Sequence, residues 1–344
     1  ARLSILEMLL FAGDDRFGAL GVSVSGQRYI PRRLGPYPRL GDLGLLSAAI
    51  EDVQAQVPIS AEIQRLLQPG VTLGGARPKA LLQTDAGPCV IKFSELGDSV
   101  DTPLVEHATM TLAALAGINV AATGVLPLPP RHGMARHALT IQRFDRMGGF
   151  RLHCLSARTA LRAAQLPESY AALASVLLRL GHPDHQRAMR EELFKRMVFN
   201  ILMDNTDDHE KNHALLVVNP HGNGRLKLAP AYDVLPSNSG QGYQEFNCGA
   251  QGHDSTLDNA MSECEAFGLL PAEAAEEVVR VIAVVNTWQA HFAKVGVSAV
   301  DIEHLATFID GDELLKQRSD FDPDRYLVAK PRGGKGGRRS PFRP

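Results

Sequence analysis

The stretch "MVFNILMDNTDDHEKNHALLVV", from Met197 to Val218, places a cluster of Asp, Asn, His and Lys between two apolar runs. Burying unpaired charge is costly. The cluster is therefore either a solvated turn or a site whose charges meet a ligand. Taken alone, it fits a charged turn between a helix and a strand as well as it fits a site, so the rest of the chain has to decide.

The spacing of oxygen-bearing side chains favours a site. Asp207 precedes Asn212 by five positions, and a further carboxylate, Asp233, follows the short predicted strand Leu226–Leu228. In phosphoryl transfer by kinases, one Asp accepts the proton of the substrate hydroxyl, while an Asn five residues later and another Asp hold magnesium on the ATP phosphates. Magnesium prefers such oxygen ligands. The spacing therefore predicts the catalytic and metal-binding segments of a kinase.

The region before the cluster contains the other parts that such an enzyme needs. Lys92 lies in the apolar stretch "CVIKFS", which is typical of the strand lysine that contacts ATP phosphates. Glu106, in the next predicted helix, is placed to pair with it. Gly74 and Gly75, in "TLGGARPK", form a turn whose backbone amides could meet phosphate oxygens. Each signal is weak alone, but their order along the chain is that of a kinase.

The predicted elements divide the chain into two parts. Alternating apolar residues predict a hairpin over 13–31 and strands within 71–95 and 139–145. A helix is expected over 101–117, capped by Asp101 or Thr102, with further helices over 40–56 and 60–67. After residue 150 the pattern is mainly helical. We predict an α+β, two-lobed, protein-kinase-like fold with a β-rich N-lobe (1–145) and a mainly helical C-lobe (146–327).

Composition limits the class of protein. Of 344 residues, 44% are hydrophobic and 22% are charged, which is ordinary for a globular protein. No apolar run has the length of a membrane helix, and four scattered cysteines without a recognised secretion signal predict a reduced, cytoplasmic protein. Residues 328–344 are rich in Gly, Pro and Arg and are expected to be a disordered basic tail. Without that tail the chain is acidic, so we expect no direct nucleic-acid binding by the folded lobes.

In combination, "NTDDHEKNH", "LAPAYDV", "LGGARPKALL", "VIKF" and "RFDR" resemble the HipA family of bacterial serine/threonine kinases. These kinases are the toxins of type II toxin–antitoxin pairs. The resemblance extends from about Ile5 to about residue 310 and implies ATP and Mg²⁺ as cofactors. It implies that Asp207 is the catalytic base, that Lys92 binds the ATP phosphates, and that Asn212 and Asp233 bind Mg²⁺.

The same resemblance implies roles for further residues. His209 and Tyr232 match residues that line the nucleotide pocket, and Gln142 and Phe144 match the hinge that contacts adenine. Thr72 stands where family members carry an autophosphorylated Ser. Two basic residues that follow the glycine turn could also reach phosphate: Lys79 and Arg77.

The resemblance also implies partners. We expect a protein substrate, of which aminoacyl-tRNA synthetases are one known class in the family, and a helix-turn-helix antitoxin of the HipB type. Members carry about another hundred residues before the segment that resembles "FAGDDRFGAL", so the chain is expected to lack an N-terminal subdomain.

Two alternatives to an active kinase remain open at this point. One is a catalytically idle relative that binds ATP or a partner, and the other is a metallohydrolase that uses Asp207, Asp208 and His209.

Overall fold

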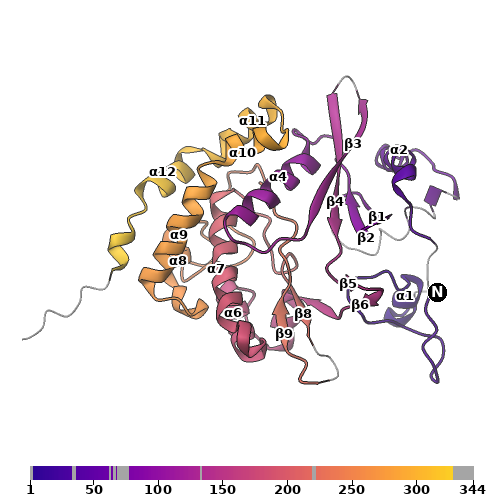
Figure 1. The fold of residues 1–344 in the computed structure, drawn as a ribbon, viewed down its shortest axis with the longest axis horizontal. Coiled ribbons are helices and arrows are strands. Elements are labelled where there is room, and N and C mark those ends of the chain that lie inside the picture. The colour runs from indigo at the N-terminus through magenta and orange to yellow at the C-terminus, as the bar shows by residue number, and fades with distance from the viewer. Residues whose placement is uncertain are drawn as a thin grey trace, which may run out of the picture.

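A four-stranded antiparallel sheet forms the centre of the first part of the chain (Figure 1). The computed structural model describes residues 3–32, 36–61, 63–64, 67, 77–131, 134–218 and 222–327. The order of strands across the sheet is β1-β2-β4-β3. The strand bounds are β1 (Lys79–Thr84), β2 (Gly87–Lys92), β3 (Thr123–Arg131) and β4 (Met134–Gln142).

Helix α4 (Thr102–Leu115) connects the sheet to the helical part of the molecule (Figure 1). It contacts β3 and β4 on one side and α10 on the other. Asp101 occupies the N-cap position as expected, but its side chain does not cap the helix. Its Oδ2 instead lies 2.5 Å from Nδ1 of His137 on β4. Gly117, with φ of 76°, follows the helix end as expected.

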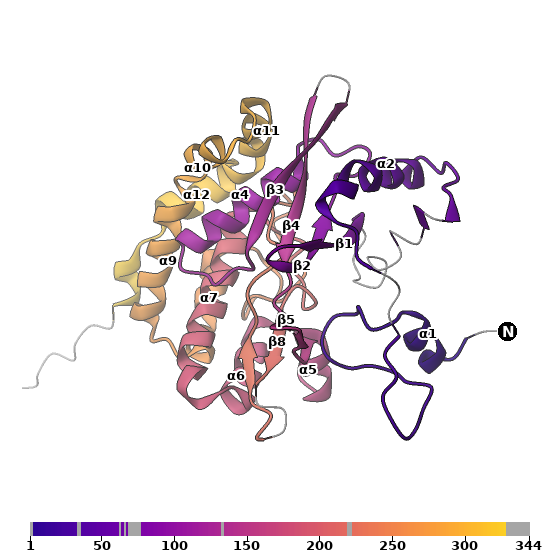
Figure 2. The same cartoon turned by 45° about the vertical axis from the view of Figure 1, so that its right-hand side comes forward.

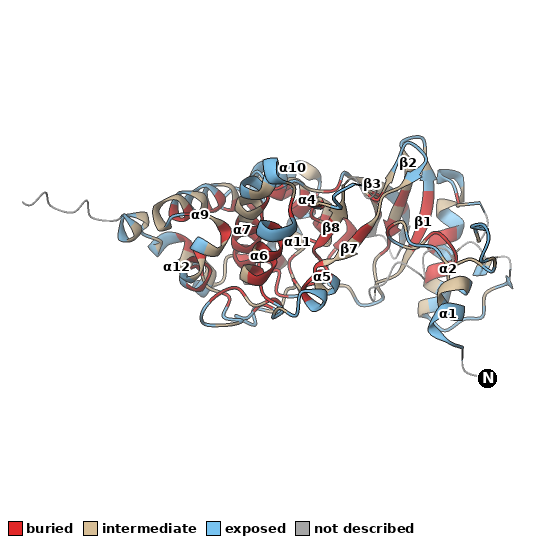
Figure 3. Cartoon of the chain, turned by 90° about the horizontal axis from the view of Figure 1, so that it is seen from below, coloured by how far each residue is buried: buried red, intermediate tan, exposed pale blue. Residues whose placement is uncertain are grey.

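The second part of the chain is mainly helical and has a continuous apolar core. Its central helices are α6 (Tyr170–Leu180), α7 (Gln186–Leu202) and α9 (Pro271–Val285). Figure 3 shows buried residues concentrated on α6 and α7. The other helices of this part are α5 (Ala157–Ala163), α8 (Leu257–Ser262), α10 (Trp288–Val295), α11 (Ala299–Ile309) and α12 (Asp312–Asp320), with 3-10 turns η2 (Pro183–His185), η3 (Cys264–Phe267) and η4 (Pro323–Tyr326).

Two small sheets complete the second part. One has the order β7-β8-β9, and the other pairs β5 with β6. The charged cluster around Asp207 lies between the end of α7 and the start of β8, and β9 leads to Asp233. The strand bounds are β5 (Arg146–Met147), β6 (Phe150–Arg151), β7 (Cys154–Ser156), β8 (Ala214–Val217) and β9 (Leu226–Leu228).

The hairpin predicted over 13–31 is wrong. The described residues 3–32 contain helix α1 (Ile5–Phe11) but no strand, and the apolar Leu20 and Val24 are 68% and 74% exposed. Backbone N–H groups in this segment bond to nearby serine side chains instead of to a partner strand. The N–H of Ile30, for example, donates to Oγ of Ser23 at 3.0 Å. Such local bonds compete with strand pairing, and an alternating pattern alone cannot reveal them.

Sequence patterns also missed β3, whose stretch "VLPLPPR" contains Pro127, Pro129 and Pro130. Proline cannot donate to a strand ladder, so it is tolerated on edge strands. The strand order places β3 at the edge of the sheet, next to β4.

The helix predicted over 40–56 corresponds to η1 (Leu40–Asp42) and α2 (Leu43–Gln54). Figure 2 shows α1 and α2 on the side of the sheet away from the helical part. Several predictions fall outside the described residues: Thr72, Gly74, Gly75, part of the helix over 60–67, and the tail 328–344. None of the helices in the described part of the chain combines the length and apolar character that a membrane crossing requires.

Candidate active site

Lys92 lies at the centre of the candidate site and is 6% exposed. It is the last residue of β2, opposite Lys79 of β1 in the strand register. Its Nζ atom lies 2.7 and 2.9 Å from the two carboxylate oxygens of Glu106 on α4. The same Nζ lies 2.5 Å from Oδ1 of Asp233, which follows β9. Three predicted residues from three distant elements therefore meet through one ammonium group.

Burial and the neighbouring charges have opposite effects on the pKa of Lys92. Burial alone would lower the pKa of Lys92, but the charges of Asp233 and Glu106 raise it above its ordinary value. For Glu106, burial dominates and raises the pKa despite the contact with Lys92. Burial would also raise the pKa of Asp233, yet the ammonium of Lys92 holds it below its usual range. The lysine is thus charged, and it keeps Asp233 ionised.

The backbone of Asp233 is in the left-handed region. Its φ is 59°, which is uncommon for a residue other than glycine. Its side chain is 38% exposed, and Oδ2 forms no hydrogen bond with the described residues. Lys79 lies close enough for its charge to help lower the pKa of Asp233, while burial lowers the pKa of Lys79 itself. Asp233 therefore presents a second carboxylate oxygen that none of the described residues occupies, beside two lysines.

The turn after α7 carries Asp207 and Asn212. Asp207 is exposed, and its backbone N–H donates to Oγ of Ser237 at 3.1 Å. Asn212 is 8% exposed and its Nδ2 donates to the carbonyl of Asp207 at 3.2 Å. Since the amide nitrogen is engaged with a carbonyl, Oδ1 is the atom of Asn212 that can meet a cation. Sequence reasoning did not identify Ser237, which ties this turn to the segment that follows Asp233.

Three aromatic rings meet beside the end of β4. The ring of Phe144 lies 5.6 Å from that of Tyr232, centroid to centroid. Phe17 packs edge-on against Phe144 at 5.4 Å and lies 6.5 Å from Tyr232. The hydroxyl of Tyr232 donates to the carbonyl of Lys211 at 2.7 Å. Phe144 and Tyr232 were predicted to line the nucleotide pocket, whereas Phe17 was missed, because nothing local connects it to residues so far along the chain.

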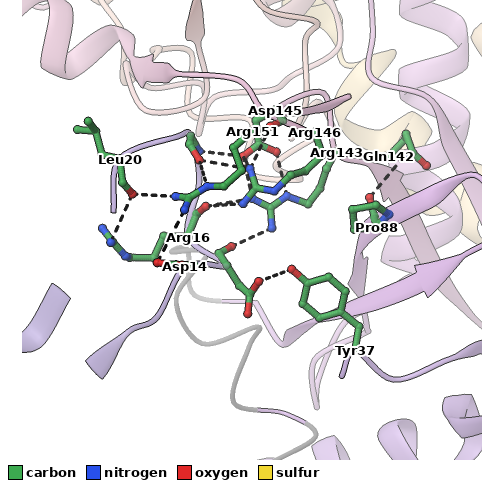
Figure 4. Close-up of polar contacts among 12 residues, drawn as sticks. Asp14, Arg16, Leu20, Tyr37, Pro88, Gln142, Arg143, Asp145, Arg146 and Arg151 are labelled. Carbon is green, nitrogen blue, oxygen red and sulfur yellow. Dashed lines mark hydrogen bonds and ion pairs between the residues drawn. The ribbon is translucent and has the colours of Figure 1, made fainter. Parts of the chain in front are cut away.

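The segment that carries Phe17 is fixed to the hinge by a buried charge cluster (Figure 4). Arg143 forms two hydrogen bonds, of 2.9 and 2.7 Å, with the carboxylate of Asp145, which is fully buried. The N–H of Gly18 donates to the same carboxylate at 2.8 Å. Arg146 donates to Asp145 at 2.6 Å and to the carbonyl of Arg16 at 2.9 Å. These contacts hold residues 16–18 against the start of the second part of the chain.

Other predicted residues have more limited roles in the described geometry. The N–H of Gln142 donates to the carbonyl of Ala122 at 2.8 Å, so that N–H is not free to meet adenine. Arg77 is engaged by Asp98, at 3.1 and 2.9 Å. His209 lies near Asp233 and contributes to lowering the pKa of that carboxyl. Its Nδ1 is buried and has no hydrogen-bond partner among the described residues.

The arrangement does not support a metallohydrolase built on Asp207, Asp208 and His209. Asp207 is exposed, whereas Asp208 is 2% exposed and accepts a hydrogen bond from the buried Tyr170. Within the described part of the chain, no group of three or more His, Cys, Asp or Glu residues is arranged to hold a metal.

Comparison with known proteins gives the family. The HipA-like C-terminal domain family matches residues 71–288. The chain belongs to this family. A protein of Haemophilus influenzae named "Putative kinase" is 26% identical to the HipA-like chain over 142 residues, which cover 38% of the chain. That match spans only 40% of the length of this relative.

Two solved structures resemble the HipA-like chain. The HipA structure from a Shewanella oneidensis complex of HipA, HipB and operator DNA matches with a TM-score of 0.66 at 17% identity. It covers 95% of the chain and 81% of that structure. The proinflammatory kinase CtkA of Helicobacter pylori matches with a TM-score of 0.52 at 13% identity, over 73% and 91% of the two chains. The predicted kinase-like α+β fold is therefore confirmed, whereas the domain boundaries at 145 and 327 stay predictions.

Proposed function

We propose that this chain is an ATP- and Mg²⁺-dependent serine/threonine protein kinase of the HipA type. The observation that carries the proposal is Lys92, whose ammonium is held between Glu106 and Asp233. A strand lysine paired with a helix glutamate is the arrangement that kinases use to bind ATP phosphates. The exposed Asp207 supplies a carboxylate on the turn that also carries Asn212.

The chain's own residues account for the transfer step. Lys92 binds and orients the phosphates of ATP. Asp207 accepts the proton of a serine or threonine hydroxyl, whose oxygen then forms the new bond to the γ-phosphorus. The bond from that phosphorus to the bridging oxygen breaks, and ADP leaves with the electron pair. Phe144 and Tyr232 would line the adenine end of the site.

The donor set fits magnesium. Oδ2 of Asp233 and Oδ1 of Asn212 are the hard oxygen ligands that the ion prefers. When bound, the ion would offset negative charge on the phosphates. The ammonium of Lys92 already holds Asp233 in its ionised form, which is the form that binds a cation.

The proposal includes partners that the resemblance implies. One is a protein substrate, with aminoacyl-tRNA synthetases as the first class to test. Another is a helix-turn-helix antitoxin of the HipB type, by analogy with the Shewanella oneidensis complex, in which HipA is found with HipB. We place the activity in the cytoplasm.

Autophosphorylation is proposed at Thr72. Mass spectrometry after incubation with ATP tests this assignment, because an unmodified Thr72 beside other phosphorylated residues would contradict it.

The decisive experiment is transfer from radiolabelled ATP with magnesium to the chain itself or to proteins of a bacterial lysate. The wild type should label a protein, and Asp207→Asn should abolish labelling while the variant stays folded. The exposed Asp184, whose side chain is 82% exposed, provides a matched control. Asp184→Asn should label normally. Equal activity of the wild type and Asp207→Asn would refute the base assignment, and no transfer by the wild type would favour an idle relative.

Growth of a bacterial culture tests the toxin role. Induction of the wild-type chain should slow growth, and co-expression of a HipB-type antitoxin should relieve the arrest. Asp207→Asn at matched protein levels should not slow growth, because the arrest is proposed to require phosphoryl transfer. Equal arrest by both chains would show that toxicity does not come from kinase activity.

A further inference from the structure

Neighbouring carboxylates on the turn after α7 face opposite environments. Asp207 is exposed, while Asp208 is 2% exposed. The proposed transfer step uses Asp207 and has no use for Asp208. A buried carboxylate is nevertheless costly unless it is paired and hydrogen-bonded. The partners of Asp208 therefore indicate what it does.

Asp208 joins segments that are far apart in the sequence. The hydroxyl of Tyr170, the first residue of α6, donates to Oδ2 of Asp208. Nε2 of His213 lies 3.0 Å from Oδ1, and both side chains are 3% exposed. The N–H of Phe246 donates to the backbone carbonyl of Asp208 at 2.9 Å. Asp208 is thus a point where three segments are tied beneath the turn.

Two side-chain amides, those of Asn200 and Asn205, support the contact between Tyr170 and Asp208. Nδ2 of Asn200, near the end of α7, donates to the Tyr170 hydroxyl oxygen at 3.2 Å. Asn205 donates in turn to Oδ1 of Asn200 at 3.1 Å. Burial and then the charge of Asp208 raise the pKa of Tyr170 well above its ordinary value. Tyr170 therefore stays protonated and remains a donor to Asp208.

The contact with His213 closes the turn, because His213 directly follows Asn212. It joins the two ends of a short segment whose side chains at Asp207 and Asn212 have the proposed catalytic and metal-binding roles. Inside the turn, the N–H of Asn212 donates to the carbonyl of His209 at 2.8 Å. A cavity of about 10 Å³ behind the turn is lined in part by Asp208, Asn212 and His213, which is room for roughly one water. The inner side of the turn is therefore packed against the protein interior, and the contact between Asp208 and His213 ties its two ends together.

We propose that Asp208 is a positioning residue for phosphoryl transfer, acting through Tyr170 and His213 to fix the backbone that presents Asp207 and Asn212. The inference rests on the proposed kinase function. Changing a residue that orients metal ligands or catalytic groups through its own contacts typically lowers metal affinity or activity 10- to 100-fold. We expect a loss of that size in kcat, with a smaller effect on the apparent affinity for ATP, because Lys92, Asp233 and the adenine end of the site do not depend on this contact and Asn212 is the weaker of the two proposed metal ligands.

The test compares Asp208→Asn with a matched control in the full chain. Asparagine keeps the shape of Asp208, but an NH₂ group replaces one of the two carboxylate oxygens, so the side chain no longer presents an oxygen to both Tyr170 and His213. Asp310→Asn is the control, because Asp310 accepts from Trp288 and pairs with Arg318, away from the turn. Asp208→Asn should lower kcat about 10- to 100-fold and leave KM for ATP within about threefold. Asp310→Asn should leave kcat unchanged in the folded protein.

Hydrogen exchange of the amides of residues 207–212 gives a readout that does not depend on activity. Exchange should be faster in Asp208→Asn than in the wild type and unchanged in Asp310→Asn. The double variant Asp208→Asn/His213→Leu should lose less activity than the product of the losses in the two single variants, because both changes break the same contact. The proposal is overturned if kcat in Asp208→Asn equals that of the control, or if exchange in the turn is unchanged. If the wild type transfers no phosphate, the kinase proposal fails, and the exchange result alone decides whether Asp208 positions the turn.

Discussion

The Nζ atom of Lys92 lies 2.5 Å from Oδ1 of Asp233, while the same ammonium contacts both oxygens of Glu106. One positive charge therefore stabilises two carboxylates, one on a helix beside the sheet and the other after β9. The two carboxylates differ in exposure: Glu106 is 1% exposed, whereas the side chain of Asp233 is 38% exposed. Loss of the ammonium should therefore affect Glu106 more than Asp233, which water can reach.

Lys92→Met should destabilise the protein by about 3 kcal/mol at pH 8, because it leaves Glu106 buried without its partner. The pKa of Glu106 is already raised by burial and should rise further without Lys92. As pH falls through that raised pKa, the carboxyl becomes neutral and the cost should shrink. Denaturant unfolding at pH 8 and pH 5 measures both effects.

The double variant Lys92→Met/Glu106→Gln is the control for this interpretation. It should regain much of the lost stability at pH 8 and show little of the extra pH dependence, since no buried carboxylate remains beside the methionine. A double variant as unstable as Lys92→Met alone would show that Glu106 is not the source of the cost.

Asp233→Ala should weaken binding of Mg-ATP far more than binding of metal-free adenosine, because the proposed ligand oxygen faces the phosphates and not the base. Calorimetry with the two ligands measures the difference. Equal losses for both ligands would contradict the metal-binding role. Asn212→Ala should act in the same direction with a smaller effect, since a neutral amide is a weaker magnesium ligand than a carboxylate.

Phe17→Ala should lower the affinity for adenosine by at most about fivefold, because the edge-on contact that holds the Phe144 ring in place at the proposed adenine end contributes about 1 kcal/mol. Phe150→Ala is the matched control, since Phe150 is 75% exposed on β6. Calorimetry should find normal adenosine binding for the control. Unchanged binding by Phe17→Ala would show that the N-terminal segment does not shape the adenine end of the site.

All four cysteines are free and buried: Cys89, Cys154, Cys248 and Cys264. Burial raises the pKa of Cys89 to about 11 and that of Cys154 and Cys248 to about 12. The thiolate is the reactive form, and at pH 8 it amounts to about one part in a thousand at Cys89. Iodoacetamide should therefore label the native protein slowly and all four thiols rapidly in denaturant, as mass spectrometry would show. Fast labelling of any one thiol in the native protein would contradict its burial.

Sequence patterns predicted the parts of the site that short motifs determine. Lys92, Glu106 and Asp233 come together as expected, because the strand, the helix and the post-strand carboxylate each have a local signature. Phe17 and Ser237 have none, since their roles arise only from contacts across the fold. The hinge cluster around Asp145 was missed for a similar reason. Of the three partners of its carboxylate, Gly18 becomes a neighbour only after the N-terminal segment has docked.

That cluster gives a prediction about acid stability. Burial alone would raise the pKa of Asp145, but hydrogen bonds and charge from Arg143, together with Arg146 and the N–H of Gly18, lower it below its ordinary value of 3.8. A carboxyl with a lowered folded pKa adds stability above its unfolded pKa and loses it as pH falls through the folded value. The contribution of Asp145 should therefore be complete above about pH 4 and decline below that.

Asp145→Asn removes this contribution and leaves Arg143 and Arg146 without their shared anion. At pH 7 the variant should have a thermal midpoint several degrees below that of the wild type, because breaking a buried pair costs about 3 kcal/mol. The difference between the two midpoints should narrow as pH falls from 4 toward 3, since the wild-type carboxyl is then being protonated as well. Asp184→Asn, at an exposed position, should follow the wild type at every pH. A difference between Asp145→Asn and wild type that stays constant from pH 7 to pH 3 would show that the ionised carboxylate of Asp145 is not what fixes the N-terminal segment to the hinge.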